Sequence, residues 1–249
     1  MTKPLRNRVI IVTGGASGIG AAIVHRLHAE GAQVVIGDVL DSEGLALAES
    51  LGNDVAYQRL DVSHFDAWQS AVAFAEKRYG PVTGLVNNAG IFAAAGPIQE
   101  VAEADFRRVI DINLVAVFLG MKAVLPSMKK SPGGSIVNIS SVAAIVGNPE
   151  TLAYTASKAG VRGMSKSAAL EFAPLGIRVN SVHPGYVDTQ MIASQIPSEQ
   201  AEEFRRSICP LGRLAAPAEI ASLVLFLISD ESSYVTGGEY IIDGGYSAR

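Results

Sequence analysis

Tyr154 and Lys158 lie four residues apart in a segment with helical periodicity, Ala153 to Ala173, so their side chains project from the same helix face. A free tyrosine hydroxyl has a pKa of about 10 and is a weak acid–base catalyst at neutral pH, but a neighbouring ammonium group favours the phenolate. The pair therefore predicts proton transfer at a tyrosine oxygen. Because the same spacing is common by chance in exposed pairs, its surroundings decide the interpretation.

Two further polar residues belong with this pair. Ser141 follows a predicted strand thirteen residues before Tyr154, and it places a hydroxyl at the carboxyl edge of the sheet, where open α/β proteins bind ligands. It can hold and polarise a substrate oxygen. Asn113 lies inside the helical run Phe106 to Met128, an unfavourable place for asparagine. That position indicates either a local kink or a water-holding role in a proton path, and both interpretations stay open.

A glycine-rich turn, Thr13-Gly14-Gly15-Ala16-Ser17-Gly18-Ile19-Gly20, directly follows the first apolar strand and opens an apolar helical pattern. Such a turn presents unpaired backbone N–H groups and the positive end of a helix dipole to a pyrophosphate, and its glycines allow close approach. A simple turn is the alternative. The placement between strand and helix favours a dinucleotide site.

The next strand ends at Asp38, eighteen residues after Gly20, where a carboxylate can accept hydrogen bonds from the adenosine ribose. It would repel the extra phosphate of NADP, and no cation occurs in Val39-Leu40-Asp41, so NAD is favoured; the alternative is that Asp38 caps a turn. Asp61-Val62, after the third strand, is predicted either to contact the adenine or to form the region that caps the following helix.

Short β-branched runs alternate with helical segments along all 249 residues, which predicts one domain, residues 1–249, with a doubly wound parallel sheet and helices on both faces. Between His183 and about Ala216 this rhythm lapses, and a polar helical stretch, Ser198 to Arg206, lies inside; residues 186–216 are therefore expected to form a loop or lid over the substrate. The expected strands are Val9 to Val12, Val34 to Ile36, Val55 to Leu60, Val82 to Asn87, Ser135 to Ser140, Arg178 to His183 and Tyr240 to Ile242.

Composition narrows the ligand. A net charge of −4 gives no indication of binding to nucleic acid or to an anionic membrane. No apolar stretch approaches a membrane span, and the apolar run after Arg8 is too short for a signal peptide. We therefore expect a cytoplasmic protein with a small ligand. Cys209 is the only cysteine and is expected to be buried. The histidines lack metal-ligand spacing, so no metal is expected.

Taken together, the turn from Thr13 to Gly20, Asn87-Asn88-Ala89-Gly90, Ser141 with Tyr154-x-x-x-Lys158, and Pro184-Gly185 resemble the short-chain dehydrogenase/reductases over the whole chain. The resemblance implies a Rossmann-type fold and, in many members, a homotetramer. It also implies a catalytic tetrad of Asn113, Ser141, Tyr154 and Lys158. Tyr154 would exchange a proton with the substrate oxygen, and Lys158 would hold the nicotinamide ribose. The cofactor-binding residues implied are Gly14, Ser17, Gly18, Ile19, Gly20, Asp38, Asp61, Val62, Asn88, Ala89, Gly90, Tyr154, Lys158, Pro184, Gly185, Val187 and Thr189.

The residues expected near the reacting carbon are apolar or aromatic, which predicts a hydrophobic ketone or secondary alcohol, with cyclic and hydroxysteroid-like compounds among the candidates. The alternative enzyme is a 3-oxoacyl-carrier-protein reductase, and the alternative from another class is a non-catalytic dinucleotide-binding regulator, which has no need of a complete Ser-Tyr-Lys set. The expected pocket residues are Phe92, Ala143, Val146, Tyr186 and Met191.

Overall fold

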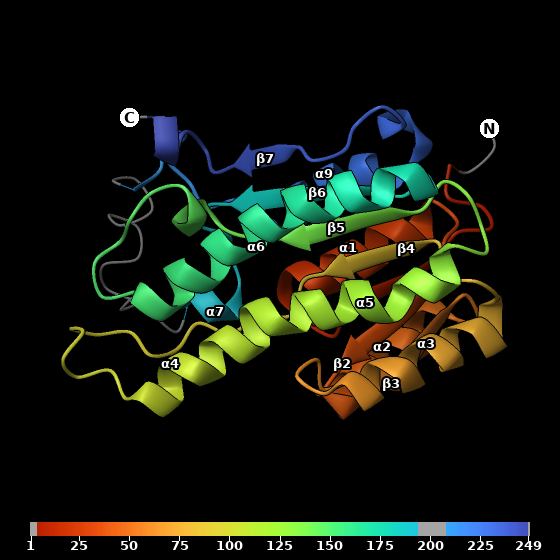
Figure 1. The fold of residues 1–249 in the computed structure, drawn as a ribbon, viewed down its shortest axis with the longest axis horizontal. Coiled ribbons are helices and arrows are strands. Elements are labelled where there is room, and N and C mark those ends of the chain that lie inside the picture. The colour runs from red at the N-terminus through yellow and green to blue at the C-terminus, as the bar shows by residue number, and fades with distance from the viewer. Residues whose placement is uncertain (1–3, 194–207, 249) are drawn as a thin grey trace.

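The computed structural model describes residues 4–193 and 208–248. Within them seven strands form one parallel sheet in the order β3-β2-β1-β4-β5-β6-β7, which confirms the predicted doubly wound architecture (Figure 1). Each expected strand is present, with ends that differ by one or two residues. The strands are β1 (Val9–Thr13), β2 (Gln33–Asp38), β3 (Val55–Arg59), β4 (Gly84–Asn87), β5 (Ser135–Ile139), β6 (Arg178–Pro184) and β7 (Glu239–Ile242).

Helices cover both faces of this sheet. Helices α1, α2 and α9 pack on one face, and α3, α5 and α6 pack on the other. The described helices are α1 (Gly18–Ala29), α2 (Asp41–Leu51), α3 (Phe65–Tyr79), α4 (Glu103–Ile110), α5 (Ala116–Met128), α6 (Leu152–Phe172), α7 (Gln190–Ala193) and α9 (Pro217–Ile228).

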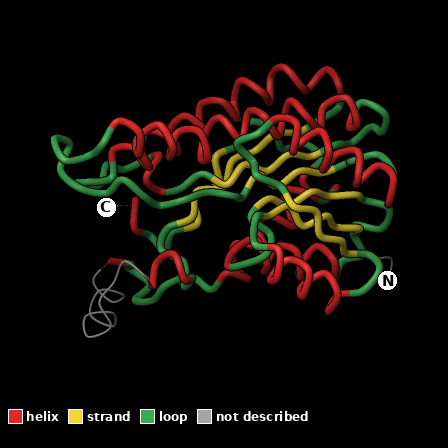
Figure 2. Tube along the Cα trace, turned by 90° about the horizontal axis from the view of Figure 1, so that it is seen from below, coloured by secondary structure: helices red, strands yellow, loops and turns green. Residues whose placement is uncertain are grey.

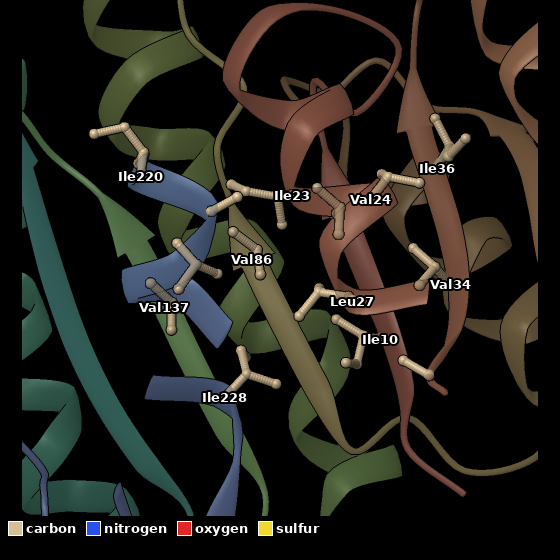
Figure 3. Close-up of a cluster of buried hydrophobic side chains, with 14 of the residues drawn as sticks. Ile10, Ile23, Val24, Leu27, Val34, Ile36, Val86, Val137, Ile220 and Ile228 are labelled. Carbon is tan, nitrogen blue, oxygen red and sulfur yellow. The ribbon is translucent and has the colours of Figure 1, made fainter. Parts of the chain in front are cut away.

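Strand β1 shows why both faces are apolar. Ile10 and Val12 point into the cluster under α1 and α9, whereas Val9 and Ile11 point into the cluster under α3 and α5. Figure 3 shows the first cluster, to which α1 contributes Ile23 and α9 contributes Ile220 over the central strands. Because alternate side chains of a strand face opposite sides, a strand covered on both sides must be apolar throughout.

All strands run in one direction, so their carboxyl ends meet at one edge of the sheet, where the long loops, α7 and the C-terminus also lie (Figure 1). Strand order reverses between β1 and β4, which are neighbours although β2 and β3 lie between them in sequence. Ligands of open α/β sheets bind outside the carboxyl ends at such a reversal point. The fold therefore directs a ligand site to the loops after β1, β4 and β5.

The helical run from Glu103 to Met128 is interrupted by a π-helical turn, η1 (Asp111–Val115), between α4 and α5. This 26-residue run also corrects the expectation that no apolar stretch approaches a membrane span: its most apolar window has a mean hydropathy of 1.8, with 44% of that window buried. In this structure α4 packs against α6 and α5 packs against α3.

The predicted lid, residues 186–216, is described at its two ends, and the helical stretch expected at 198–206 lies outside the described residues. The two ends are joined by a short parallel bridge between Val187 and Ala215, where Ala215 N donates to Tyr186 O and Asp188 N donates to Ala215 O. Figure 2 shows both ends emerging at the carboxyl edge of the sheet. Cys209, in the second described end of the predicted lid, is buried, as expected.

Candidate active site

The glycine turn has the form that a pyrophosphate site needs. Gly14 and Gly18 have positive φ angles of 61° and 53°, and a Cβ at Gly20 would lie 1.9 Å from the Gly14 carbonyl oxygen, so only glycine fits there. Helix α1 begins at Gly18, and Ser17 makes no side-chain hydrogen bond to cap it. The N–H groups of Gly18, Ile19 and Gly20 therefore start the helix without intrahelical acceptors, as anion-binding helix ends do.

Asp38 lies against this turn at the end of β2. Its carboxylate accepts hydrogen bonds from Ala16 N at 2.9 Å, Val39 N at 2.7 Å and Leu40 N at 3.2 Å. The carboxylate caps the turn after β2, as one interpretation predicted, and it also contacts the glycine turn; its contact with the ribose stays a prediction. Three backbone donors hold its orientation while leaving lone-pair capacity for another donor.

Asp61 accepts hydrogen bonds from the backbone N and hydroxyl of Ser63 at 3.0 and 2.7 Å, and the Ser63 hydroxyl is the main cause of a lowered pKa for this carboxyl. Helix α3 begins four residues later at Phe65, so Asp61 orders the turn that leads into the helix. The carbonyl of Val62 accepts from Trp68 Nε1 at 2.9 Å. These contacts favour the structural interpretation, and the contact of Asp61-Val62 with adenine stays a prediction.

A cation that sequence reasoning missed lies beside Asp38. Arg59, at the end of β3, extends along the turn after β2, where its Nη1 contacts Val39 O at 3.1 Å and Asp41 Oδ2 at 2.5 Å. Sequence reasoning looked for cations only in the residues that follow Asp38. The strand register places Arg59 here, because Asp38 and Arg59 are direct partners in the β2–β3 pair.

The Asn87-Asn88 segment braces the neighbouring strands. Asn87 Nδ2 donates to Asn138 Oδ1 at 2.9 Å on β5. The Asn88 side chain donates to the carbonyls of Thr13 and Gly14, while Asn88 N and Ala89 N donate to the Thr13 hydroxyl. These bonds lock the end of β4 to the first residues of the glycine turn.

Ser141, Tyr154 and Lys158 converge at the carboxyl ends of β5 and β6. The Ser141 side chain lies close enough to the Tyr154 hydroxyl to lower its pKa. Lys158 is buried, its Nζ donates to Ile139 O at 3.0 Å, and it lies 5.7 Å from the centroid of the Tyr154 ring. The Ser140 hydroxyl donates to the Lys158 carbonyl at 2.9 Å, which fixes α6 on β5.

Electrostatics at this cluster differ from the sequence-based expectation. Burial raises the pKa of Tyr154 above its ordinary value, and the Ser141 hydrogen bond acts only in the opposite, lesser direction. Burial also lowers the pKa of Lys158 to about 8. Among the chain's own groups, burial of the phenol therefore opposes the phenolate. The tyrosine is neutral at neutral pH, which suits a proton donor.

Asn113 occupies the π-helical turn, so the helix does deviate at this residue, as one of its two interpretations predicted. Its Oδ1 accepts from Ile91 N and its Nδ2 donates to Ile91 O, both at 2.8 Å, with a further contact to Ser157 Oγ at 3.3 Å. Ser157 Oγ donates in turn to the Tyr154 carbonyl at 2.7 Å. The amide therefore ties the loop after β4 to the helix that carries Tyr154, and its water-holding role stays a prediction.

On the substrate side, Phe92 lies with its ring centroid 5.1 Å from that of Tyr154. Ala143 lies in a short 3-10 helix, η2 (Val142–Ala144), is buried and donates its N–H to Ser141 Oγ at 3.1 Å. Val146, just after this helix, is half-buried. Tyr186 packs edge-on to Tyr246 with 5.6 Å between centroids, and burial raises the pKa of Tyr186 to about 12. Met191, in α7, is 40% exposed.

Tyr246 is a second residue that sequence reasoning missed. It lies in the C-terminal turn η6 (Tyr246–Ala248), and its hydroxyl donates to Asn148 Oδ1 at 2.9 Å, in the loop between Ser141 and Tyr154. The C-terminus thus covers the substrate side. Nothing in the residue types near the C-terminus indicates this, since the contact depends on where β7 ends.

The residues after β6 complete the edge that faces the glycine turn. Pro184 pairs with Ile242 in the sheet, and a Cβ at Gly185 would lie 2.8 Å from Asp243 Cα, so this glycine allows β7 to pack closely. Thr189 lies beside Gly18, since a Cβ at Gly18 would be 3.5 Å from Thr189 Cγ2. Gly90 is equally placed against the cluster, because a Cβ there would lie 3.2 Å from Asn113 Oδ1 and 3.5 Å from Lys158 Nζ. The open helix start and these side-chain-free positions form a cradle that fits a dinucleotide.

Comparison with known proteins agrees with this geometry. A family model described as enoyl-(acyl carrier protein) reductase matches residues 14–247. A 3-alpha-(or 20-beta)-hydroxysteroid dehydrogenase of Mycobacterium tuberculosis is 46% identical over 98% of this chain and 91% of its own length. A trans-4-hydroxycyclohexanecarboxylate dehydrogenase of Sinomonas cyclohexanicum is 46% identical over 97% and 93%. An NADP-dependent (R)-specific alcohol dehydrogenase of Lentilactobacillus kefiri is 41% identical over the full length of both chains.

Among solved structures, that of gox2181 superposes with a TM-score of 0.95 at 35% identity and covers 100% of this chain and 98% of the other. A family match across nearly the whole chain, full-length relatives and a shared fold agree with a glycine turn, a paired Asn segment and a Ser-Tyr-Lys cluster at one sheet edge. The chain belongs to the short-chain dehydrogenase/reductase family of oxidoreductases.

Proposed function

We propose that this protein transfers a hydride between NAD(H) and a hydrophobic secondary alcohol or ketone, with Tyr154 as the general acid and base. The observation that carries the proposal is the convergence of Ser141, Tyr154 and Phe92 at the carboxyl edge of the sheet. A hydroxyl pair beside an apolar ring is suited to bind a carbonyl oxygen and shield its carbon from water. A regulator that only binds dinucleotide would need none of these side chains.

Each side chain has a proposed task. Tyr154 gives its proton to the carbonyl oxygen during reduction and takes it back during oxidation, while the Ser141 hydroxyl holds the same oxygen. The bound nicotinamide supplies or accepts the hydride. Lys158 holds the nicotinamide ribose, and Asn113 maintains the loop after β4, extending the proton path through water as the family resemblance implies. The glycine turn, Thr189 and the Asn88 to Gly90 segment hold the rest of the dinucleotide.

The choice of NAD over NADP rests on Asp38. Its carboxylate is oriented by three backbone donors beside the glycine turn, where it can accept the ribose hydroxyl and repel a phosphate. The comparisons include a relative named as NADP-dependent, so the family alone does not decide the cofactor. The charge and position of Asp38 support NAD.

A cyclic secondary alcohol is the proposed substrate class. The expected pocket residues Phe92, Ala143, Val146, Tyr186 and Met191 are apolar or aromatic. Relatives at 46% identity are named for a hydroxysteroid and for a hydroxycyclohexane carboxylate. The second candidate, an acyl-carrier-protein reductase, is favoured by the description of the family model alone. We rank it lower because a phosphopantetheine-linked substrate would be expected to meet cationic side chains, whereas these expected pocket residues, all of which the structure describes, are uncharged.

A homotetramer in the cytoplasm completes the proposal. Several large apolar side chains of the α4 to α6 region are exposed in the single chain, and exposed apolar surface of this kind favours a subunit interface. These residues are Phe106, Val115, Phe118, Leu152 and Leu170.

The decisive experiment is a panel of substrates and cofactors followed at the nicotinamide absorbance. Cyclohexanol and a 3α-hydroxysteroid are offered with NAD or NADP, and a 3-oxoacyl thioester is offered with NADH or NADPH. Oxidation of the cyclic alcohols with NAD is the expected result. Efficient reduction of the thioester with NADPH, and none of the alcohol oxidation, would establish the second candidate instead.

A further inference from the structure

The turn after β2 holds an ion pair that the proposed function leaves unexplained. Arg59 Nη1 and Asp41 Oδ2 are 2.5 Å apart, and the Arg59 and Asp41 side chains are 60% and 52% exposed. Exposed pairs contribute little to stability, because solvent screens them and ordering two side chains costs entropy. A contribution to stability is therefore a weak reason for this pair.

Asp41 is held on its other oxygen as well. The Tyr57 hydroxyl lies 2.6 Å from Asp41 Oδ1 and 2.9 Å from the Asp38 carbonyl oxygen. Asp41 is also the first residue of α2, so the helix start fixes its backbone. The carboxylate thus has a set position, and the longer, more exposed arginine adapts to it.

The position of Arg59 matters because of its strand register. Asp38 and Arg59 are partners in the parallel β2–β3 pair, and the guanidinium reaches back over the turn that begins at Val39. Dinucleotide sites that bind NAD place an acid at the end of the strand that corresponds to β2. Sites that accept the 2′-phosphate of NADP have an arginine near that position. Here both groups are present, and the arginine is paired with a second acid.

We propose that Asp41 strengthens the preference for NAD set by Asp38, because it holds Arg59 in an ion pair, and that release of Arg59 creates a binding group for the 2′-phosphate of NADP. This inference rests on the proposed use of NAD. Asp41 is a positioning residue that acts through Arg59, and Asp38 remains the group that faces the ribose. Once it is released from Asp41, the Arg59 guanidinium can turn away from this carboxylate, and its fork of N–H donors suits a bidentate phosphate contact.

A double-mutant cycle tests the coupling directly. Dissociation constants of NADP and NAD are measured by calorimetry for the wild type, Asp41→Asn, Arg59→Gln and the double variant. Asparagine keeps the size of the Asp41 side chain and can still accept from Tyr57. We expect Asp41→Asn to tighten NADP binding roughly tenfold, and Arg59→Gln to remove that gain in the Asp41→Asn background while changing little in the wild type.

If the two charges act independently on NADP, Arg59→Gln weakens NADP binding by the same factor in the wild type and in Asp41→Asn. Such additivity would overturn the proposal. Glu43→Gln is the matched control, since Glu43 lies in the same first turn of α2 and hydrogen-bonds Ser42 rather than Arg59. This variant should keep the dissociation constant of NADP within about twofold of the wild type, because Glu43 does not contact Arg59 and solvent screens its exposed charge. A wild type that binds NADP more tightly than NAD contradicts the proposed function itself, and that result is read before the cycle.

Discussion

The adenosine end and the substrate end of the site are built from different kinds of contact. At the adenosine end, glycines, backbone N–H groups and the Asp38 carboxylate interlock, and a Cβ at Gly20 would lie 1.9 Å from a backbone oxygen. At the substrate end, side chains of Ser141, Tyr154 and Phe92 meet on separate loops and a helix. Changes at the first end should therefore affect folding and cofactor binding together, whereas changes at the second should affect chemistry or substrate choice and leave cofactor binding unchanged.

Backbone conformation makes the same distinction. Glycines supply the left-handed residues of the glycine turn, but Ala94 and Glu150, in the loops beside the substrate, adopt positive φ angles of 55° and 62° without being glycines. Gly96 N donates to Glu150 O at 2.8 Å and joins these two loops. Such conformations cost of the order of 1–3 kcal/mol and persist where surrounding contacts hold them. The substrate end thus carries strain that the adenosine end avoids.

The largest effect is expected from Tyr154→Phe. Loss of the hydroxyl removes the proton donor and should lower turnover by about 10²- to 10⁴-fold, the usual contribution of a positioned acid or base. NAD binding and the thermal midpoint should stay near those of the wild type, because the ring and its contact with Phe92 remain. Steady-state kinetics and calorimetry check this, and retained turnover would refute the assignment of Tyr154.

Gly20→Ala should produce the opposite pattern. The new methyl group would overlap the Gly14 carbonyl oxygen, so the glycine turn must shift, at a cost of about 1–3 kcal/mol in the free energy of unfolding and with weaker NAD binding. Gly163→Ala is the matched control, because a Cβ at this exposed position of α6 meets nothing within 4 Å. It should stabilise the helix by about 0.5–1 kcal/mol. Urea denaturation compares the two, and equal effects would erase the contrast between the two ends.

The pH profiles of the two reaction directions test the electrostatics of Tyr154. Because burial raises the pKa of this tyrosine, its hydroxyl is protonated across the neutral range. Alcohol oxidation needs the basic form, so its kcat/KM should rise with pH by up to about tenfold per unit below the pKa, while ketone reduction should change little. An oxidation profile that is flat from about pH 6 to about pH 9 would show that the phenol is not the base.

The smallest effect is expected from Tyr246→Phe. The variant keeps the ring contact with Tyr186 and loses the hydrogen bond to Asn148, which should lower the free energy of unfolding by about 0.5–1.5 kcal/mol. Since this contact lies at the substrate end, KM for the alcohol should change while KM for NAD does not. A change confined to NAD would place Tyr246 at the wrong end of the site.

Much of this arrangement was predictable from local patterns. Alternation of β-branched runs with helical periodicity gave all seven strands, and the glycine turn with Asp38 and the Ser-Tyr-Lys set gave the two ends of the site. These features depend on neighbours in sequence, or on the rule that parallel strands share a carboxyl edge. The strand ends differed by a residue or two, because ladders extend as far as the partner strand allows.

The features that sequence reasoning missed all depend on contacts between distant segments. Arg59 contacts Asp41 because of the register of β2 and β3. Tyr246 contacts Asn148 because the loops after β7 and β5 lie at the same edge of the sheet. The raised pKa of Tyr154 likewise reflects how deeply the assembled loops bury it, which residue types alone do not give. Spacing identifies candidate groups, whereas packing decides their charge and partners.

The bonds between Thr13 and Asn88 have a consequence for how the chain acquires its fold. These residues are 75 positions apart, and α1 and two strand–helix units, β2–α2 and β3–α3, lie between them. Closing so large a loop is entropically costly, and chains rich in such distant pairings fold slowly. We therefore expect the β1–β4 junction to be a late, rate-limiting step in folding, and the glycine turn to gain its final shape only then.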